Sequence, residues 1–191
     1  MWRATSIFLI AVTALAMVLG LCRRNWPYSG TGPLSKDIFM VTRTNAGEVL
    51  DPEHPCGAVS LCLVAQWLRS PVELAVSTRS IQADSLGRTT MSELVEGIQS
   101  MGFEAEPVRL GNGALQRVSL PMILFVRKSH FVAALPTGAN AVVFVDPPYQ
   151  PEVISEDKLR SVAQWSGEAL LVARGSEPMM ETLVRLGVRK D

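Results

Sequence analysis

The segment HPCGAVSLCLVAQWL, residues 54–68, places a cysteine and a glycine directly before an almost entirely apolar run. Apolar residues of positions 58–68 occupy every face of a helix, which is the pattern of a fully buried helix. Cys56 stands at the expected start of this helix, where free N–H groups and the helix dipole stabilise a thiolate. Gly57 permits close approach of a substrate. The segment therefore predicts either a reactive thiol or a small apolar residue at a helix start.

Composition excludes several classes of function. The chain has 191 residues, of which 48% are hydrophobic, which is enough for one ordinary domain with an appendage. Lys and Arg number 18, as do Asp and Glu, so no basic face for nucleic acid is expected. Three cysteines without a CxxC motif and only two histidines argue against a disulfide framework and against a Cys/His zinc site.

The N-terminal segment TSIFLIAVTALAMVLGLC, residues 5–22, carries no charge and is bounded by arginines on both sides. Its length suits a helix that crosses a bilayer. A cleaved signal peptide is the alternative, with a cleavage site at residues 14–16, but cleavage there would leave an apolar new terminus. A lipoprotein signal is disfavoured because a small residue is expected directly before its cysteine, whereas Leu21 precedes Cys22. We expect a single-pass anchor whose orientation the flanking charges leave open.

The rest of the chain reads as helices followed by strands. A short helix is expected from Ser70-Pro71, and Thr90-Met91-Ser92-Glu93 is a capping box that opens a helix ending at Gly102. Ser155 is expected to cap a helix through about Gln164, and a Pro178-led helix ends the chain. Short β-branched and apolar runs predict strands, namely EAEPVRL, LPMILFV, HFVAAL, AVVFVD and EALLVA.

This order predicts an α+β fold, with N-terminal helices packed on an antiparallel sheet and preceded by one membrane helix. The predicted division of the chain is an anchor or signal segment at 1–26, a tether at 27–49, a domain at 50–175 and a C-terminal helix at 176–191.

A cysteine nucleophile needs a base, and the base needs a group that orients it. His130 begins HFVAAL and is the only histidine in the second half of the chain, and Asp146 ends AVVFVD. If these strands pair as a hairpin, the imidazole and the carboxylate lie at the same sheet edge. Each residue alone also fits a structural role. Together, Cys56, His130 and Asp146 are the candidate catalytic residues.

These blocks resemble those of the bacteriocin-processing, double-glycine leader peptidases, which are papain-like cysteine peptidases. The matching motifs are Cys56-Gly57 opening a helix, Pro121 to His130-Phe131-Val132, Asp146-Pro147 and Trp165-Ser166-Gly167. The resemblance covers roughly residues 50–174. It implies a papain-like fold and a Cys-His-Asp mechanism.

One position departs from the family pattern. The family usually has a glutamine six residues before the cysteine, whose amide helps to hold the oxyanion, but this chain has Leu50 there. Asn45 or His54 could supply a donor, although both also suit an ordinary loop. Loss of one such donor costs about a hundred- to a thousandfold in rate, so activity is less well predicted than fold.

The resemblance thus implies a membrane-anchored cysteine peptidase in which Cys56 attacks a peptide carbonyl, His130 transfers the proton and Asp146 orients the imidazole. No cofactor is expected. The expected partners are a peptide or protein substrate, the membrane and a separate export transporter, because the chain has no P-loop of its own. The alternatives are a non-catalytic peptide-binding module of the same fold and a related cysteine acyltransferase.

Overall fold

The computed structural model describes residues 55–81, 88–147 and 149–188. All described residues belong to one compact unit, Asp37–Asp191. Within these residues, no helix has the length and apolar character needed to cross a bilayer. The predicted anchor at residues 5–22 lies outside the described part of the chain.

Helix α3 spans Cys56–Trp67 and is the buried helix that the apolar run predicts. Its residues from Gly57 to Ala65 are all buried, in keeping with a segment that has no polar face. Helix α3 packs on the sheet, and the Ser60 hydroxyl donates a hydrogen bond to the Phe131 carbonyl (3.1 Å). This bond satisfies a buried polar group and fixes the helix against the strand that carries His130.

Two further helices lie beside α3. Helix α5, Met91–Ser100, begins with the predicted capping box: Thr90 Oγ1 accepts from the Glu93 N–H, and the Glu93 carboxylate accepts from the Thr90 N–H. The prediction for the other helix was wrong at its start, because α4 spans Leu74–Ser80 and has no Ser70 cap. The Ser70 N–H is used instead to close α3, by donating to the Ala65 carbonyl (3.0 Å).

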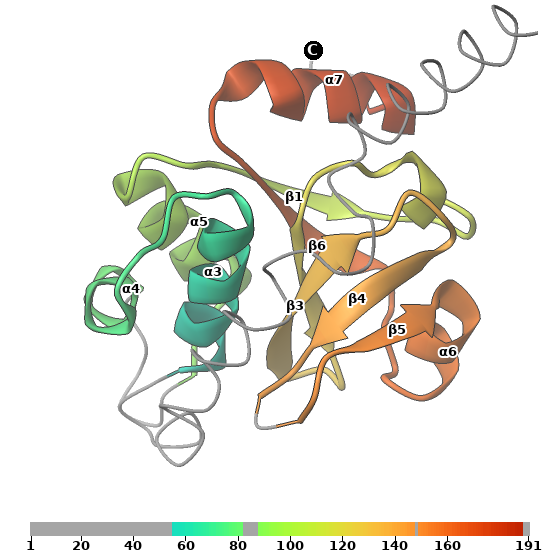
Figure 1. Ribbon diagram of the computed structural model, residues 1–191, viewed down its shortest axis with the longest axis horizontal. Helices are drawn as coiled ribbons and strands as arrows, with labels where there is room; N and C mark the ends of the chain where they lie inside the picture. Colours follow the sequence, from blue (N-terminus) through green and yellow to red (C-terminus); the bar gives the residue numbers. More distant parts are fainter. Residues whose placement is uncertain (1–54, 82–87, 148, 189–191) are drawn as a thin grey trace, which may run out of the picture. The chain divides into compact units, whose positions relative to one another are not determined.

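Six strands form one antiparallel sheet in the order β1-β6-β2-β3-β4-β5 (Figure 1). The α+β prediction with an antiparallel sheet is thus confirmed. Five of the strands are the predicted ones, and the prediction missed the short edge strand β5. The strands are β1 (Glu104–Arg109), β2 (Met122–Val126), β3 (His130–Pro136), β4 (Ala141–Val145), β5 (Glu152–Ser155) and β6 (Glu168–Ala173).

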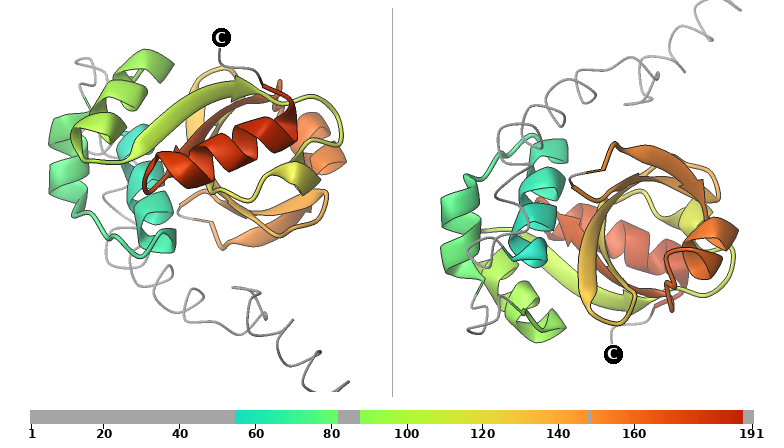
Figure 2. Two further views of the ribbon diagram at one scale, coloured as in Figure 1. Left: turned by 90° about the horizontal axis from the view of Figure 1, so that it is seen from above. Right: turned by 90° about the horizontal axis from the view of Figure 1, so that it is seen from below.

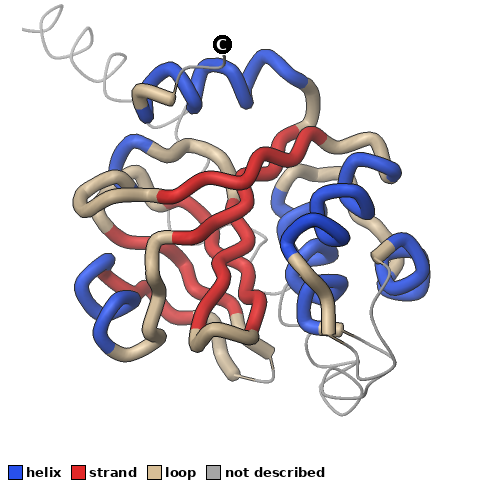
Figure 3. The backbone as a smooth tube through the Cα atoms, turned by 180° about the vertical axis from the view of Figure 1, so that it is seen from behind, coloured by secondary structure: helices blue, strands red, loops and turns tan. Residues whose placement is uncertain are grey.

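Helices α3, α4 and α5 gather on one side of the sheet (Figure 3). The sheet is strongly curved (Figure 2). Strands β2 to β6 contribute to the main apolar cluster, and Val108 of β1 packs against it. This cluster is completed by the 3-10 helix η1 (Leu115–Arg117), by α6 (Glu156–Ser161) and by α7 (Ser176–Leu186). Ser155 caps α6 as predicted, by accepting from the Lys158 N–H, but the helix ends at Ser161 and not near Gln164.

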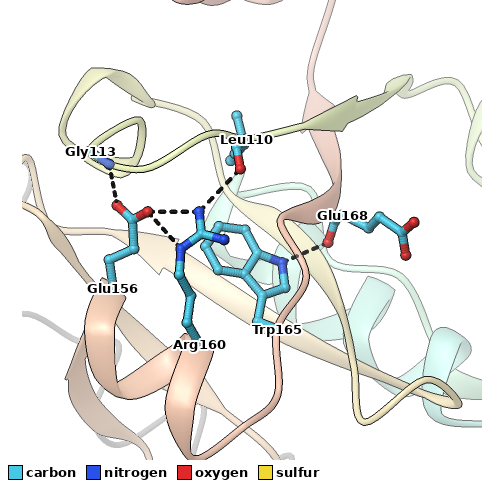
Figure 4. A network of polar contacts seen from close by, with 6 residues as sticks. All are labelled: Leu110, Gly113, Glu156, Arg160, Trp165 and Glu168. Carbon is cyan, nitrogen blue, oxygen red and sulfur yellow. Dashed lines mark hydrogen bonds and ion pairs between the residues drawn. The ribbon is translucent and has the colours of Figure 1, made fainter.

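A buried polar network fastens the loop after β1 to α6 (Figure 4). Glu156 is only 2% exposed, and its carboxylate accepts from the Gly113 N–H (3.0 Å) and from the Arg160 guanidinium (2.8 Å). Arg160 also donates to the Leu110 carbonyl (3.1 Å) and lies over the Trp165 ring. The buried charge is therefore paired and fully hydrogen-bonded, which such a charge requires.

Candidate active site

Cys56 is the first residue of α3 and lies between the helices and the sheet. Pro55 precedes it in an extended conformation, so the helix begins without a side-chain cap. The Phe131 N–H points at the Cys56 sulfur, with N and Sγ 3.4 Å apart. The His130 side chain and the Gly57 N–H also act on the thiol and lower its pKa. The sulfur is thus surrounded by donors, the environment that a thiolate needs.

The β3–β4 hairpin brings His130 and Asp146 together. Ala133 pairs with Val145, so one further step along the register sets Asp146 opposite Val132 and diagonal to His130, on the same face of the sheet. His130 Nε2 lies 2.7 Å from Asp146 Oδ1. A carboxylate can only accept, which assigns the Nε2 proton to this bond and leaves Nδ1 for the thiol.

These contacts shift the pKa of both groups. Burial raises the pKa of the Cys56 thiol, but the hydrogen bonds from His130, Phe131 and Gly57 and the charge of His130 outweigh it, so the pKa is lowered from its usual value. The hydrogen bond to Asp146, followed by that to Cys56, raises the pKa of His130 to about 9. Both shifts favour the thiolate–imidazolium form of the pair over the neutral form.

Cys62 is a natural comparison within the same helix. It is buried among apolar side chains, and that burial raises its pKa to about 11 despite a hydrogen bond with Ser77. Cys62 is thus a core residue of α3. The opposite pKa shifts of Cys56 and Cys62 follow from position alone, since one thiol faces hydrogen-bond donors and the other faces hydrocarbon.

A groove of about 730 Å³ opens at Cys56. One wall comes from the start of α5, with Thr90 and Met91, and the floor comes from the sheet. The strand and turn residues that line it are Pro107, Val108, Phe125, Lys128, Ser129, Phe131, Glu168 and Ala169. A groove of this size that ends at a thiolate can hold an extended peptide with a carbonyl carbon beside the sulfur.

The structure brings together all three of the predicted site residues, Cys56, His130 and Asp146. Sequence reasoning missed the Phe131 N–H as a partner of the thiol, since it depends on how α3 docks on β3. It also missed the groove residues of the hairpin turn. Leu50, Asn45 and His54, the positions discussed for the oxyanion, lie outside the described residues. Within the part that is described, no cluster of His, Cys, Asp or Glu could hold a metal ion.

The sequence profile of the Peptidase C39 family matches residues 51–177, which is more than half of the chain. The chain belongs to this family. The resemblance to bacteriocin-processing, double-glycine leader peptidases is thereby confirmed, and the match covers Cys56, His130 and Asp146. The predicted domain limits of 50–175 stay a prediction. No curated protein sequence gives a significant match.

Solved structures share the fold of this C39 domain. The peptidase domain of Streptococcus ComA, described as a bifunctional ABC transporter of a quorum-sensing pathway, has a TM-score of 0.54 at 22% identity, covering 64% of this chain and 93% of that one. A double-glycine motif protease from an AMS/PCAT transporter, solved with a leader peptide, has a TM-score of 0.53 at 20% identity. The match covers 62% of this chain and 84% of that one. The C39-like domain of a toxin secretion ATP-binding protein from Vibrio parahaemolyticus has a TM-score of 0.50 at 16% identity. The match covers 63% of this chain and 98% of that one. At these identities the likeness establishes the papain-like fold.

Proposed function

We propose that this C39 domain is a cysteine peptidase that cleaves double-glycine leader peptides, with Cys56, His130 and Asp146 as its catalytic residues. One observation carries the proposal: the thiol at the start of α3 is paired with an imidazole that Asp146 holds at 2.7 Å, and a groove opens beside it. The neighbour solved with a leader peptide supports this class of substrate.

The chemistry follows from the protonation states of the pair. The Cys56 thiolate attacks the scissile carbonyl carbon, and the electron pair of the C=O bond moves to oxygen. His130 then gives its Nδ1 proton to the leaving amine as the C–N bond breaks, which leaves a thioester on Cys56. A water molecule, deprotonated by the now neutral His130, attacks the thioester carbon, and the C–S bond breaks, which releases the acid and restores the Cys56 thiolate beside the His130 imidazolium. Asp146 keeps the imidazole in the required tautomer throughout.

The developing oxyanion is held by fewer side-chain donors than is usual for the family, because Leu50 occupies the glutamine position. The backbone N–H of Cys56 is the donor that we propose for the oxyanion, since it stands at the start of α3, while the Ala58 and Val59 N–H groups donate to the Pro55 carbonyl. We therefore propose that this protein cleaves its substrate more slowly than is usual for the family. The same departure supports the second candidate function, a peptide-binding module that retains the groove without efficient turnover.

The proposed setting is a membrane. Residues 5–22 have the length and composition of a single-pass anchor, and the structural neighbours are peptidase domains of transporters or secretion proteins. In this proposal the anchor holds the domain beside a separate export transporter that supplies the substrate.

A peptide aldehyde or vinyl sulfone ending in Gly-Gly tests the enzymatic proposal on the full chain. We expect labelling of Cys56, strong loss of labelling in His130→Ala, no effect of Cys62→Ala, and cleavage of a leader peptide after Gly-Gly. If wild type and Cys56→Ala bind a leader peptide equally well and neither turns it over, the peptidase proposal fails and the binding module is supported.

A further inference from the structure

We propose that Lys128 is a specificity-determining residue whose ammonium group, at the edge of the Cys56 groove, binds a carboxylate of the peptide substrate. The inference rests on the proposed function for the presence of a peptide in the groove. Its test measures binding separately from turnover, so the two proposals can fail independently.

The turn that carries Lys128 has an unfavourable backbone for its sequence. The Ser129 N–H donates to the Val126 carbonyl (3.2 Å), which closes a tight turn between β2 and β3. Arg127 has φ 51° and Lys128 has φ 62°, so both central residues are left-handed. This is the type I′ geometry, for which Asn-Gly or another glycine-containing pair is strongly preferred because a Cβ atom is crowded there. Two long cationic side chains occupy it instead.

The two strained residues differ in their relation to the groove. Lys128 and Ser129 line the same groove as Cys56, and Arg127 does not. Lys128 is exposed, and among the described residues no carboxylate forms an ion pair with it, although Glu168 lines the groove from β6. A cation is thus available two residues before His130, on the path that a bound peptide would follow.

Strained backbone persists where the surrounding structure or the function requires it. Glycine at position 128 would remove the crowded Cβ atom while leaving the turn and its N–H groups intact. Because Lys128 keeps a strained position at the wall of the groove and has no ion-pair partner in the described part of the chain, the geometry assigns its charge to the ligand. The ligand chemistry that fits is a carboxylate, either an acidic side chain near the scissile bond or a peptide C-terminus.

The experiment uses pairs of fluorescent double-glycine peptides. The two peptides of a pair differ only by Glu or Gln at one position, and each pair tests a different position beside Gly-Gly. All have amidated C-termini, and one further peptide without Glu has a free C-terminal acid. Binding is measured by anisotropy to the full chain with Cys56→Ala, so that no peptide is cleaved. We expect at least one Glu peptide or the free acid to bind about three- to fivefold more tightly than its neutral match, as for a partly exposed ion pair.

In the same background, Lys128→Gly should abolish this preference and Lys128→Arg should retain it, and 1 M NaCl should weaken it. Arg127→Gly is the matched control, because it relieves the same strain outside the groove: both glycine variants should raise Tm by about 2–4 °C, but Arg127→Gly should keep the charge preference. The proposal is overturned if no acidic peptide is preferred, if Lys128→Gly keeps the preference, or if Arg127→Gly loses it as well. A charge preference that depends on Lys128 in a chain without turnover would overturn the peptidase proposal alone.

Discussion

Cys56 and Cys62 illustrate how far single residues could be interpreted from the sequence. Both lie in one apolar run, and the glycine and the loop around Cys56 were enough to select it as the candidate. What the sequence does not contain is the Phe131 N–H at 3.4 Å from the sulfur, because that contact depends on the docking of a helix onto a strand far along the chain. Its contribution to thiol activation could therefore not be predicted.

At this scale, alkylation rates should separate the two cysteines. The pKa of Cys56 is lowered, whereas that of Cys62 is raised to about 11, so iodoacetamide near pH 7 should modify Cys56 much faster than Cys62. In His130→Ala the burial of Cys56 remains while its main counteracting contacts are lost, so the pH dependence of its alkylation should move upward. Mass spectrometry of Cys62→Ser provides the control. Equal rates for the two thiols would contradict this assignment.

Replacing Asp146 with Asn should change the pH dependence of the site. The hydrogen bond to Asp146 is the main reason that the pKa of His130 is raised to about 9. The stabilising effect of a raised pKa is complete below the unfolded value of about 6.5 and is lost as the pH rises through 9. Asp146→Asn should therefore reduce the free energy of unfolding by roughly 1–3 kcal/mol at pH 6 and by much less at pH 10.

Urea denaturation at the two pH values measures that difference, and the basic limb of the activity profile should move to lower pH in the same variant. Lys158→Gln, which removes an exposed ion pair with Glu152, is a control that should show little pH-dependent change. A loss of stability in Asp146→Asn that is the same at both pH values would mean that the carboxylate acts without His130.

At the scale of elements, the hairpin of β3 and β4 was predictable because His130 begins one apolar run and Asp146 ends the next, which places both at the same sheet edge. The start of α4 was not, since Ser70-Pro71 has the chemistry of a helix start while the local hydrogen bonds serve to end α3. Strand β5 was missed because it is short, lies among prolines and is defined by its pairing with β4. Local signals thus fail where tertiary pairing decides the element.

Gly167, in the connection between α6 and β6, should lose stability when it is replaced by alanine. It has φ +99°, and a Cβ atom there would lie 2.5 Å from the Leu110 carbonyl oxygen, a backbone atom that cannot move aside. Gly175 has nearly the same φ, +97°, with nothing within 4 Å of the added atom. Gly167→Ala should cost roughly 2 kcal/mol or more of stability beyond the cost of Gly175→Ala, which carries the backbone strain alone.

Chemical denaturation of the two variants measures this difference directly. The Leu110 N–H also donates to the Gly167 carbonyl (2.8 Å), so displacement at Gly167 should be transmitted to the end of β1 and to the groove residue Val108. Gly167→Ala should accordingly weaken peptide binding, while Gly175→Ala should not. Equal stability of the two variants would mean that the backbone at Leu110 can shift to make room for the added methyl group.

At the scale of the whole molecule, residues 5–22 are expected to hold the chain in a membrane. Carbonate-washed membranes should retain the intact chain, because a spanning helix is not released by high pH. Replacing two central leucines or isoleucines of this segment with arginine should release the protein, and the same replacement in the tether at 27–49 should not. Recovery of a mature soluble form that begins near Met17 would instead support a cleaved signal peptide.

The thiol and its activating groups lie far apart in the domain's sequence. Phe131, whose N–H reaches the sulfur, follows Cys56 by 75 residues. At ordinary translation rates the cysteine leaves the ribosome roughly 4–15 s before those partners are synthesised. During that interval the nascent chain carries an ordinary thiol, and reactivity begins only when β3 is complete and docks against α3. The fold thus delays activation of the thiol until β3 has been synthesised, long after α3.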